Sequence, residues 1–470
     1  MINFSTKLKY YLERSNYTIS SFAKANEIDR SLLHKYTTGT RIPKDSSFID
    51  LISEKLLLSV AEYDEFYKLW KRESVGSRLF LQREKIRDLL ENFNIYDNFT
   101  IPEVSFQSFD IDSFPKFKIT TNQHELLILI RFILSFESNK EAFPISICMQ
   151  PQYSGITNIL SDFSSLENLS VTHLVCFHQH RDSFIHNISL IENLLSLSFC
   201  INEYKIKVYY DNASQHVNQM SLLPNLIITD EFVILVSYDL GNGIIYHQKD
   251  IHNFYQNMFS EMSAACKLIT RTCTTSSDYH QFFFDHTFHY GMTQSPQMGM
   301  IATREIFEEV IHKNLDHREE FINLAIGSSE RLKVEYQKKN YCFYFTDNGA
   351  KDFIEIGRNT EFPSVLYRPL TKQESIDSIK LYLKDAAGKF VRNNMLNNKH
   401  LNYTSNIIIY LEVGKSVIFQ KPTENGFPKV IFFEETSFNE MMLDFFDNME
   451  EMGYSLSFDE STSYLKKLAE

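Results

Sequence analysis

The chain has 470 residues, of which 43% are hydrophobic, and it carries a net charge of −13 at pH 7. This length predicts about three domains; 40 Phe and 25 Tyr supply apolar surface for large cores, and 14 Gly and 11 Pro leave little room for long disordered linkers. The acidic balance argues against a protein that coats nucleic acid along its whole surface.

The first informative segment is 18–43, TISSFAKANEIDRSLLHKYTTGTRIP, which has the pattern of two helices joined by a tight turn. Ala23 allows the two helices to approach closely, and Phe22 supplies an apolar contact beside it. The residues expected to pack the second helix and then redirect the chain are Ile28, Leu33, Tyr36, Gly39, Arg41 and Pro43. Over about the first 70 residues the chain resembles the lambda-repressor-like (XRE-type) helix-turn-helix DNA-binding domain of bacterial regulators.

The local signals around this motif agree with helices. Thr18 and Asp29 are expected to cap the second and third helices, because their side-chain oxygens accept from free N–H groups of the first turn. The segment 59–62, SVAE, has the capping-box pattern and predicts another helix ending near Trp70. Glu27 departs from the family pattern, since glycine usually occupies this left-handed turn position. A small helical bundle with a chance pattern is the alternative.

The resemblance implies which residues contact DNA, because the second helix of such motifs lies in the major groove. Arg30 is expected to contact guanine through two hydrogen bonds, and Ser31 and His34 to contact bases or phosphates. The remaining cations are expected to bind phosphate, which positions the protein without reading sequence. The candidate DNA-binding residues are Asp29, Arg30, Ser31, His34, Lys35, Arg41 and Lys44. For each of them a solvated surface charge is the alternative.

Charge is distributed unevenly along the chain. Residues 1–44 contain eight basic and three acidic residues, a net charge of +5, whereas the rest of the chain sums to −18. A basic head on an acidic body suits a regulator with one DNA-binding face. Many bacterial cytosolic enzymes are equally acidic, so an enzyme with an acidic body is the alternative.

The pattern changes after this N-terminal unit. A helix over 77–93 carries an apolar stripe and predicts a connector that packs on its own chain, with dimerisation as the alternative. From about residue 119, helices alternate with β-rich strands at 144–149, 171–177 and 205–210, which predicts an α/β domain with a largely parallel sheet. The longest apolar run, 126–136, contains Arg131 and is too short to span a membrane.

Two stretches of the body have similar patterns. Asn225–Met262 and Asn406–Met449 both read as strand, turn, strand, loop, strand and then an aromatic helix ending in Met. The similarity indicates two related α/β halves, with chance similarity between β-rich segments as the alternative. The predicted domains are a helix-turn-helix domain at 1–72, a linker helix at 73–98 and α/β halves at 99–270 and 271–470.

The first of these stretches resembles the end of a phospholipase D-like module. The catalytic pattern of that family, His-x-Lys-x4-Asp, is absent: aligning Asp230 places Asn225 and Leu223 at the lysine and histidine positions. The one His-x-Lys, at 247–249, has Phe254 where the aspartate belongs. The resemblance therefore implies a binding domain that lacks the nucleophile and phosphate clamp.

No other motif predicts a cofactor or a metal. Six scattered cysteines indicate free thiols, and Gly-rich phosphate loops are absent. Histidines gather in two segments without the spacing of a metal site, and packing among aromatic residues is the favoured interpretation. These histidines are His173, His178, His180, His186, His280, His286 and His289.

These observations predict an α+β multidomain protein, with an N-terminal all-α helix-turn-helix domain followed by an α/β body. The favoured function is a cytoplasmic transcription regulator, which binds an inverted-repeat operator in double-stranded DNA as a homodimer. Its body would sense a small molecule, peptide or protein effector and control the dimer geometry. The alternative is an enzyme of the α/β body, nucleotide- or nucleic-acid-processing, that uses the helix-turn-helix for targeting or autoregulation.

Overall fold

The fold was obtained as a computed structural model. The residues that it describes are 3–93, 114–151, 154–178, 184–211, 222–273, 285–298, 303–315, 317–337, 341–359, 361–385, 391–422 and 427–470. The chain divides into two compact units, Met1–Lys85 and Ile86–Glu470. The finer domain boundaries expected from the sequence stay predictions.

The first unit is helical and closes around one apolar core. Phe4, Tyr11 and Phe66 lie at its centre, with ring centroids 4.9 Å apart for Phe4–Phe66 and 5.4 Å for Tyr11–Phe66. The expected capping box is present, since the Ser59 side chain accepts from the N–H of Glu62 and the Glu62 carboxylate accepts from the N–H of Ser59. The helices are α1 (Phe4–Arg14), α2 (Ile19–Ala25), α3 (Arg30–Thr37), α4 (Ser47–Lys55) and α5 (Val60–Val75).

Helix α6 (Ser77–Glu91) runs from the first unit into the second without interruption. Its apolar stripe continues to Phe93, which is fully buried. The Phe93 ring meets Phe199 at 6.1 Å and Phe419 at 5.6 Å, both edge to face. The C-terminal end of this connector therefore packs on its own chain.

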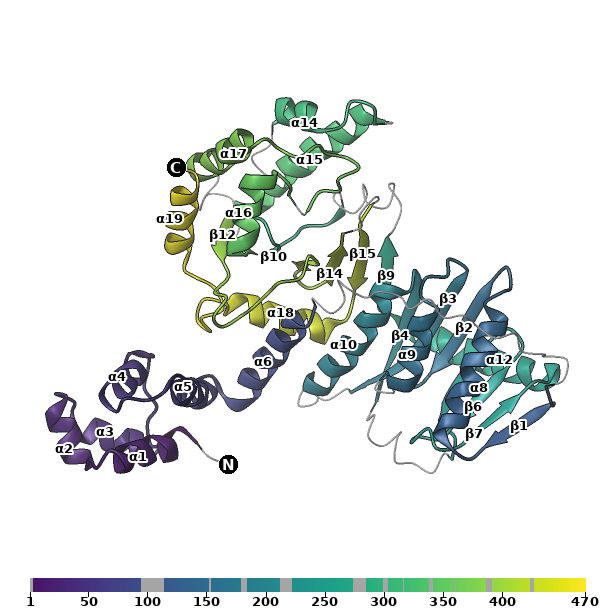
Figure 1. Ribbon diagram of the computed structural model, residues 1–470, viewed down its shortest axis with the longest axis horizontal. Coiled ribbons are helices and arrows are strands. Elements are labelled where there is room, and N and C mark those ends of the chain that lie inside the picture. Colours follow the sequence, from purple (N-terminus) through teal and green to yellow (C-terminus); the bar gives the residue numbers. More distant parts are fainter. Residues whose placement is uncertain are drawn as a thin grey trace. The chain divides into compact units, whose positions relative to one another are not determined.

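The body begins with an eight-stranded sheet (Figure 1), in the order β1-β7-β6-β5-β2-β3-β4-β8. Strands β2, β3 and β4 are parallel, and every other neighbouring pair is antiparallel. The strands are β1 (Phe117–Thr120), β2 (Phe143–Cys148), β3 (Leu169–His178), β4 (Glu203–Asp211), β5 (Asn225–Ile228), β6 (Val233–Val236), β7 (Gly243–Tyr246) and β8 (Lys267–Leu268). The helices are α8 (Gln123–Glu137), α9 (Ser154–Asp162), α10 (Phe184–Cys200) and α12 (Lys249–Ala265).

The second sheet has seven strands in the order β12-β11-β10-β13-β14-β15-β9. Its strands are β9 (Thr270–Cys273), β10 (Tyr290–Met292), β11 (Tyr341–Phe345), β12 (Val391–Met395), β13 (Ile408–Glu412), β14 (Ser416–Lys421) and β15 (Lys429–Phe433). The helices that follow or cover them are α14 (Arg304–Val310), α15 (Arg318–Tyr336), α16 (Asp347–Ile356), α17 (Lys372–Asp385), α18 (Thr436–Asp447) and α19 (Phe458–Leu468).

The two sheets share one topology. Replacing β1–β7 by β9–β15 in chain order converts the first strand order into the second, and every pair keeps its parallel or antiparallel sense. In the first sheet the eighth strand, β8, pairs antiparallel with β4. The second sheet has a short counterpart, because Leu396, the residue after β12, forms an antiparallel bridge with Ser455. The expectation of two related halves is thus confirmed at the level of topology.

The expectation of a largely parallel sheet is wrong. Only β2–β3–β4 and β10–β11–β12 run parallel, where helices connect the strands, while short turns join the strands of each β-meander, β5–β7 and β13–β15.

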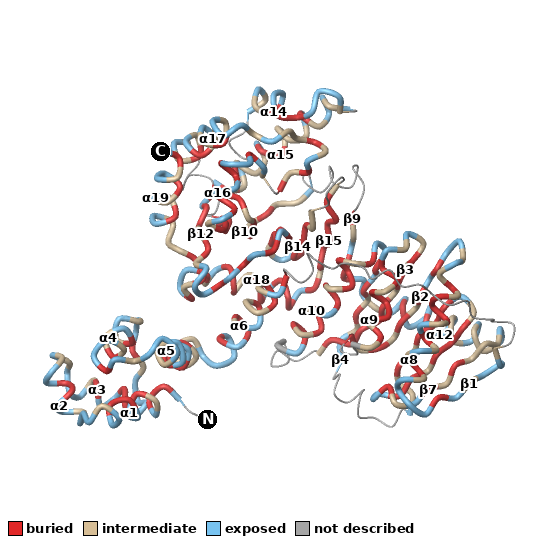
Figure 2. The backbone as a smooth tube through the Cα atoms, viewed as in Figure 1, coloured by how far each residue is buried: buried red, intermediate tan, exposed pale blue. Residues whose placement is uncertain are grey.

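Buried residues follow the strands of both sheets (Figure 2), so each half has its own core. The protein is an α+β multidomain chain in which a helical region precedes an α/β body. None of the helices in the described ranges combines the length and apolar character needed to cross a membrane.

Candidate nucleic-acid interface

Helices α2 and α3 pack closely through small and apolar side chains. Ala23 and Phe22 are 2% and 0% exposed, and Leu33 of α3 is fully buried. Glu27 occupies the left-handed turn with φ of +55°, the conformation that the sequence predicts at this position. The turn accepts a non-glycine residue at a modest conformational cost. It also closes on a backbone bond, in which the Ile28 N–H donates to the Ala23 carbonyl at 2.9 Å.

Capping and helical spacing set the orientation of α3. The Asp29 carboxylate accepts from the Leu32 N–H at 2.7 Å, so its role in the structure is to start the helix. Arg30 and His34 are four residues apart, as are Ser31 and Lys35, so two rows of polar side chains follow the exposed face. All four are exposed, whereas Leu33, Tyr36 and Thr37 form the buried face.

The C-terminal exit of α3 is held in place by buried contacts. Gly39 has φ of +73°, and the N–H of Arg41 donates to the Lys35 carbonyl at 3.3 Å, which folds the exit back on the helix. The Pro43 carbonyl then accepts from Trp70 Nε1 at 2.9 Å. Arg41 and the next cation, Lys44, are exposed on this fixed segment, so the exit extends the polar face of α3.

The basic residues among the first 44 positions fall into two groups. Those of α1 are paired with carboxylates: Lys7 with Glu65 at 2.6 Å, Lys9 with Glu13 at 3.7 Å, and Arg14 with Glu62. Those of α2, α3 and the exit make no side-chain hydrogen bond or ion pair with any described residue. The second group consists of Lys24, Arg30, Lys35, Arg41 and Lys44.

This segregation determines what the surface can do chemically. Exposed cations without protein partners can exchange their solvent and counterions for phosphate, whereas a paired lysine must first leave its carboxylate. Arginine also offers the planar donor pair that matches guanine in the major groove. In the structure all the predicted DNA-binding residues are exposed, and they lie on α3, its N-cap and its C-terminal exit. The structure also adds Lys24, which shares their environment and which the sequence prediction omitted.

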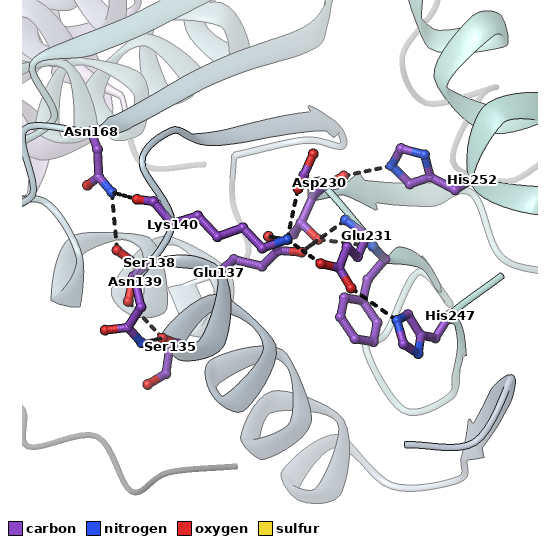
Figure 3. Close-up of polar contacts among 12 residues, drawn as sticks. Ser135, Glu137, Ser138, Asn139, Lys140, Asn168, Asp230, Glu231, His247 and His252 are labelled. Atoms are coloured by element: carbon purple, nitrogen blue, oxygen red, sulfur yellow. Dashed lines mark hydrogen bonds and ion pairs between the residues drawn. The ribbon is translucent and has the colours of Figure 1, made fainter. Parts of the chain in front are cut away.

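In the body, two of the residues compared with the phospholipase D pattern, Asp230 and His247, belong to a network of polar contacts centred on Lys140 and Glu231 (Figure 3). Lys140 Nζ lies 2.7 Å from Glu137, 2.8 Å from Asp230 and 2.6 Å from Glu231. Burial alone would lower the pKa of Lys140, but hydrogen bonds with the three carboxylates raise it. His247 contacts Glu231 at 3.2 Å through Nε2. These contacts fix the turn between β5 and β6 to the end of α8.

Among the described histidines of the two His-rich segments, His178 and His186 lie edge to face with ring centroids 4.5 Å apart, whereas the others have separate partners. His173 is buried between the Tyr204 hydroxyl and the Met149 carbonyl, at 2.6 and 2.9 Å, and burial lowers its pKa to about 4. His286 Nδ1 lies 2.6 Å from Glu412 Oε2, and His289 accepts from a backbone N–H. His180 and His280 lie outside the described residues. Within the described ranges, no three His, Cys, Asp or Glu side chains are placed to hold a metal ion.

Comparisons with known proteins identify no family. No family model and no curated protein matches the chain. One similar solved structure is TrmBL2, an archaeal chromatin protein with a novel mode of DNA binding, at 9% identity and TM-score 0.23, covering 57% of this chain and 94% of that one. Another is polyphosphate kinase from Porphyromonas gingivalis, at 10% identity and TM-score 0.24, covering 78% and 59% respectively. Both TM-scores are too low to indicate a shared fold.

Proposed function

We propose that this protein is a sequence-specific DNA-binding transcription regulator, and that its α/β body senses a ligand or partner. The observation that supports this best is the segregation of charge in the N-terminal unit. The cations of α1 are paired with carboxylates, while Arg30, Lys35, Arg41 and Lys44 are exposed without a partner among the described residues. This arrangement provides one face for the major groove and leaves the acidic remainder repelled by DNA.

Affinity and specificity would come from different residues on this face. Lys35, Arg41 and Lys44 would neutralise phosphates and release counterions, which makes binding strongly dependent on salt. Arg30 and Ser31, in the first turn of α3, would contact base edges. Two heads in a homodimer would read an inverted repeat, whose half-site spacing depends on how the bodies hold the heads.

Helix α6 provides a route from the body to the head. It is continuous across the boundary between the two units, and its last turn is anchored in the body. Phe93 contacts Phe199 of the first half and Phe419 of the second, so the anchor lies where the two halves meet. A ligand that changed the packing of the halves would thereby shift the population of DNA-competent dimers.

The decisive experiment is genome-wide DNA capture with the purified full-length protein and its Arg30→Ala variant. We expect an inverted repeat to be enriched by the wild type, with discrimination falling by about 1–3 kcal/mol in the variant. Lys9→Ala is the matched control, because Lys9 is equally exposed but paired with Glu13 within α1. Unchanged operator affinity in Arg30→Ala would show that α3 does not read DNA.

A salt titration separates phosphate binding from base reading. Lys44→Ala should weaken binding to operator and unrelated DNA by the same factor and reduce the slope of log affinity against log salt by about 1. If no motif is enriched at low or moderate salt, the head serves another contact. The alternative, an enzyme of the α/β body, would then be the hypothesis to test.

A further inference from the structure

A groove of about 380 Å³, lined mostly by residues with polar side chains, lies in the second half of the body. Its lining includes residues at the ends of parallel strands, Gln294 two residues after β10 and Thr346 directly after β11, and these two form its floor. From β10 the chain builds β11 and β12 on one side and then crosses to β13 on the other. Such a switch in an α/β sheet leaves a crevice at the carboxyl ends of the strands, which is where ligands of these folds bind. The volume also lies in the range of about 300–1,000 Å³ typical of small-molecule sites.

One wall of the groove is the exposed face of α16. Asn348, Asp352 and Ile356 are four residues apart and line the groove in a single row. The helix lies close to the floor, and a side chain at position 349 would prevent this, because a Cβ on Gly349 would lie 2.0 Å from the Gln294 carbonyl oxygen. At its other end Gly357 adopts φ of +71°, against the Leu370 carbonyl. At both positions the absence of a side chain allows this wall to lie close to the neighbouring backbone.

The opposite wall is the segment 398–406, in which burial alternates from residue 401 onward. Leu401, Tyr403 and Ser405 are buried and anchor the segment, so the residues between them face outward. Asn402 and Thr404 line the groove from these outward positions.

Gln294 ties the two walls together. Its Nε2 donates to the Ser405 carbonyl of one wall at 2.5 Å. Its Oε1 accepts from the hydroxyl of Thr346, the N-cap of α16, at 2.7 Å. The groove is therefore a connected structure whose walls share one floor residue.

The wall side chains define the ligand chemistry. Asn348, Asn398 and Asn402 are exposed carboxamides that make no side-chain hydrogen bond with the described part of the chain. Each carboxamide both donates and accepts, as does a hydroxyl group. Asp352 and Arg358 contribute one negative and one positive charge, so the groove has no net charge to select an anion or a cation. Ile356, 56% exposed, offers an apolar contact in this polar setting.

We propose that this groove binds a neutral, polyhydroxylated small molecule of the size of a mono- or disaccharide. The carboxamides would exchange hydrogen bonds with its hydroxyls, and Arg358 and Asp352 would each bind a pair of them. Ile356 would contact the C–H surface of the sugar ring.

The groove is also linked to the connector helix. The backbone N–H of Asn402 donates to Glu91 Oε1 at 2.9 Å, and Glu91 is the last residue of α6. A ligand held by the Asn402 side chain would move the wall that this hydrogen bond joins to α6. Action of the ligand on DNA binding rests on the proposed function, whereas ligand binding itself does not.

Calorimetry on the full-length protein without DNA tests the site. The panel consists of neutral hexoses and their disaccharides, free amino acids as zwitterions, and inorganic phosphate. We expect saturable binding of at least one neutral sugar, weakened at least tenfold in Asn402→Ala and in Asp352→Asn. The controls are Asn193→Ala and Asp459→Asn, exposed residues of α10 and α19 outside the groove, which should bind as the wild type does.

Each result has a defined meaning. Binding only of amino acids or phosphate, lost in the same variants, would overturn the proposed ligand class. Binding of no compound, or binding that the groove variants retain, would overturn the site. Sugar binding in a protein that enriches no DNA motif would overturn the proposed regulator and leave the site in place.

A second variant tests the link to DNA. Glu91→Ala removes the side chain that accepts from Asn402 N–H and leaves the groove side chains untouched. We expect unchanged sugar affinity and a loss of the effect of sugar on operator affinity. An unchanged sugar effect would show that the signal does not pass through this hydrogen bond.

Discussion

The two halves of the body share a topology but use the same closing helix differently. In the second half, Met442, Phe445 and Met449 of the α18 segment are at most 1% exposed. This helix lies against its own strands β13 and β14 and against α10 of the first half (Figure 1). In the first half, the corresponding apolar stripe on α12 remains largely open to solvent, with Phe254 59% exposed.

This difference shows how a repeated unit acquires distinct roles without changing its strand order. The pattern of large apolar residues along one helical face is the same in both halves, so the pattern alone does not determine burial. What differs is the neighbour: α18 meets a helix from the other half, whereas the main contacts of α12 are with β5 and β6 of its own sheet. The apolar face of α12 is therefore exposed in the first half, whereas the corresponding face of α18 is buried in the second half.

The largest effect is expected from truncating the covered helix. Phe445→Ala removes a ring that is 1% exposed and stacked on Tyr454 at 5.5 Å, and should cost about 3–5 kcal/mol of local stability. The corresponding change in α12, Phe254→Ala, should cost about 0.5 kcal/mol, because that ring is mostly solvated. Native-state hydrogen exchange of the two helices measures both. Equal losses would mean that something covers α12 in solution.

The next effect concerns the first turn of each β-meander. In the first half Lys140 pairs with the fully buried Glu137 as well as with Asp230 and Glu231, so Lys140→Met should cost about 3 kcal/mol. In the second half Lys415 lies 2.7 Å from Glu412 but its side chain is 66% exposed. Lys415→Met should therefore cost less than about 1 kcal/mol. Hydrogen exchange in β5–β6 and β13–β14 provides the comparison, and a larger loss for Lys415→Met would reverse the assignment.

The sequence predicted the parts of the protein that depend on local interactions. Capping by Thr18 and Asp29 joins residues three apart, and the turn at Glu27 involves its immediate neighbours, so composition and spacing suffice to locate them. The repeat was also visible, because each β-meander and its helix form a continuous segment.

Pairing between distant strands could not be predicted in the same way. The first strand of each half pairs with the last strand of its meander, as Thr120 does with Gly243, more than 100 residues away. Separation along the chain also hid the groove, whose walls come from α16 and from 398–406. The sequence did contain one signal for it: Asn occurs repeatedly between 393 and 406, in alternation with anchoring apolar residues over part of that stretch. These asparagines form a groove only together with α16, and the folded chain is needed to show that α16 lines the same groove.

The smallest expected effect is a pair of opposite pH responses. In the second half, burial raises the pKa of Glu361 to about 7, against hydrogen bonds from Tyr410, Asn359 and Gln297 that lower it. The folded state therefore holds a proton that the unfolded state has released, and stability is lost as pH rises from about 4.5 to 7. In the first half, burial lowers the pKa of His173 to about 4, so stability is lost as pH falls from about 6.5 to 4.

Hydrogen exchange, corrected for the intrinsic effect of pH on exchange, can follow both halves in one experiment. Between pH 6 and 8 the second half should lose about 1 kcal/mol, and between pH 6 and 5 the first half should lose a similar amount. Glu361→Gln should flatten the first response and leave the second unchanged, because Glu361 and His173 lie in the cores of different sheets. His173→Gln should do the converse. If both halves of the wild type lost stability in both pH ranges, the halves would unfold as one unit, and the shared topology would describe their architecture but not their energetics.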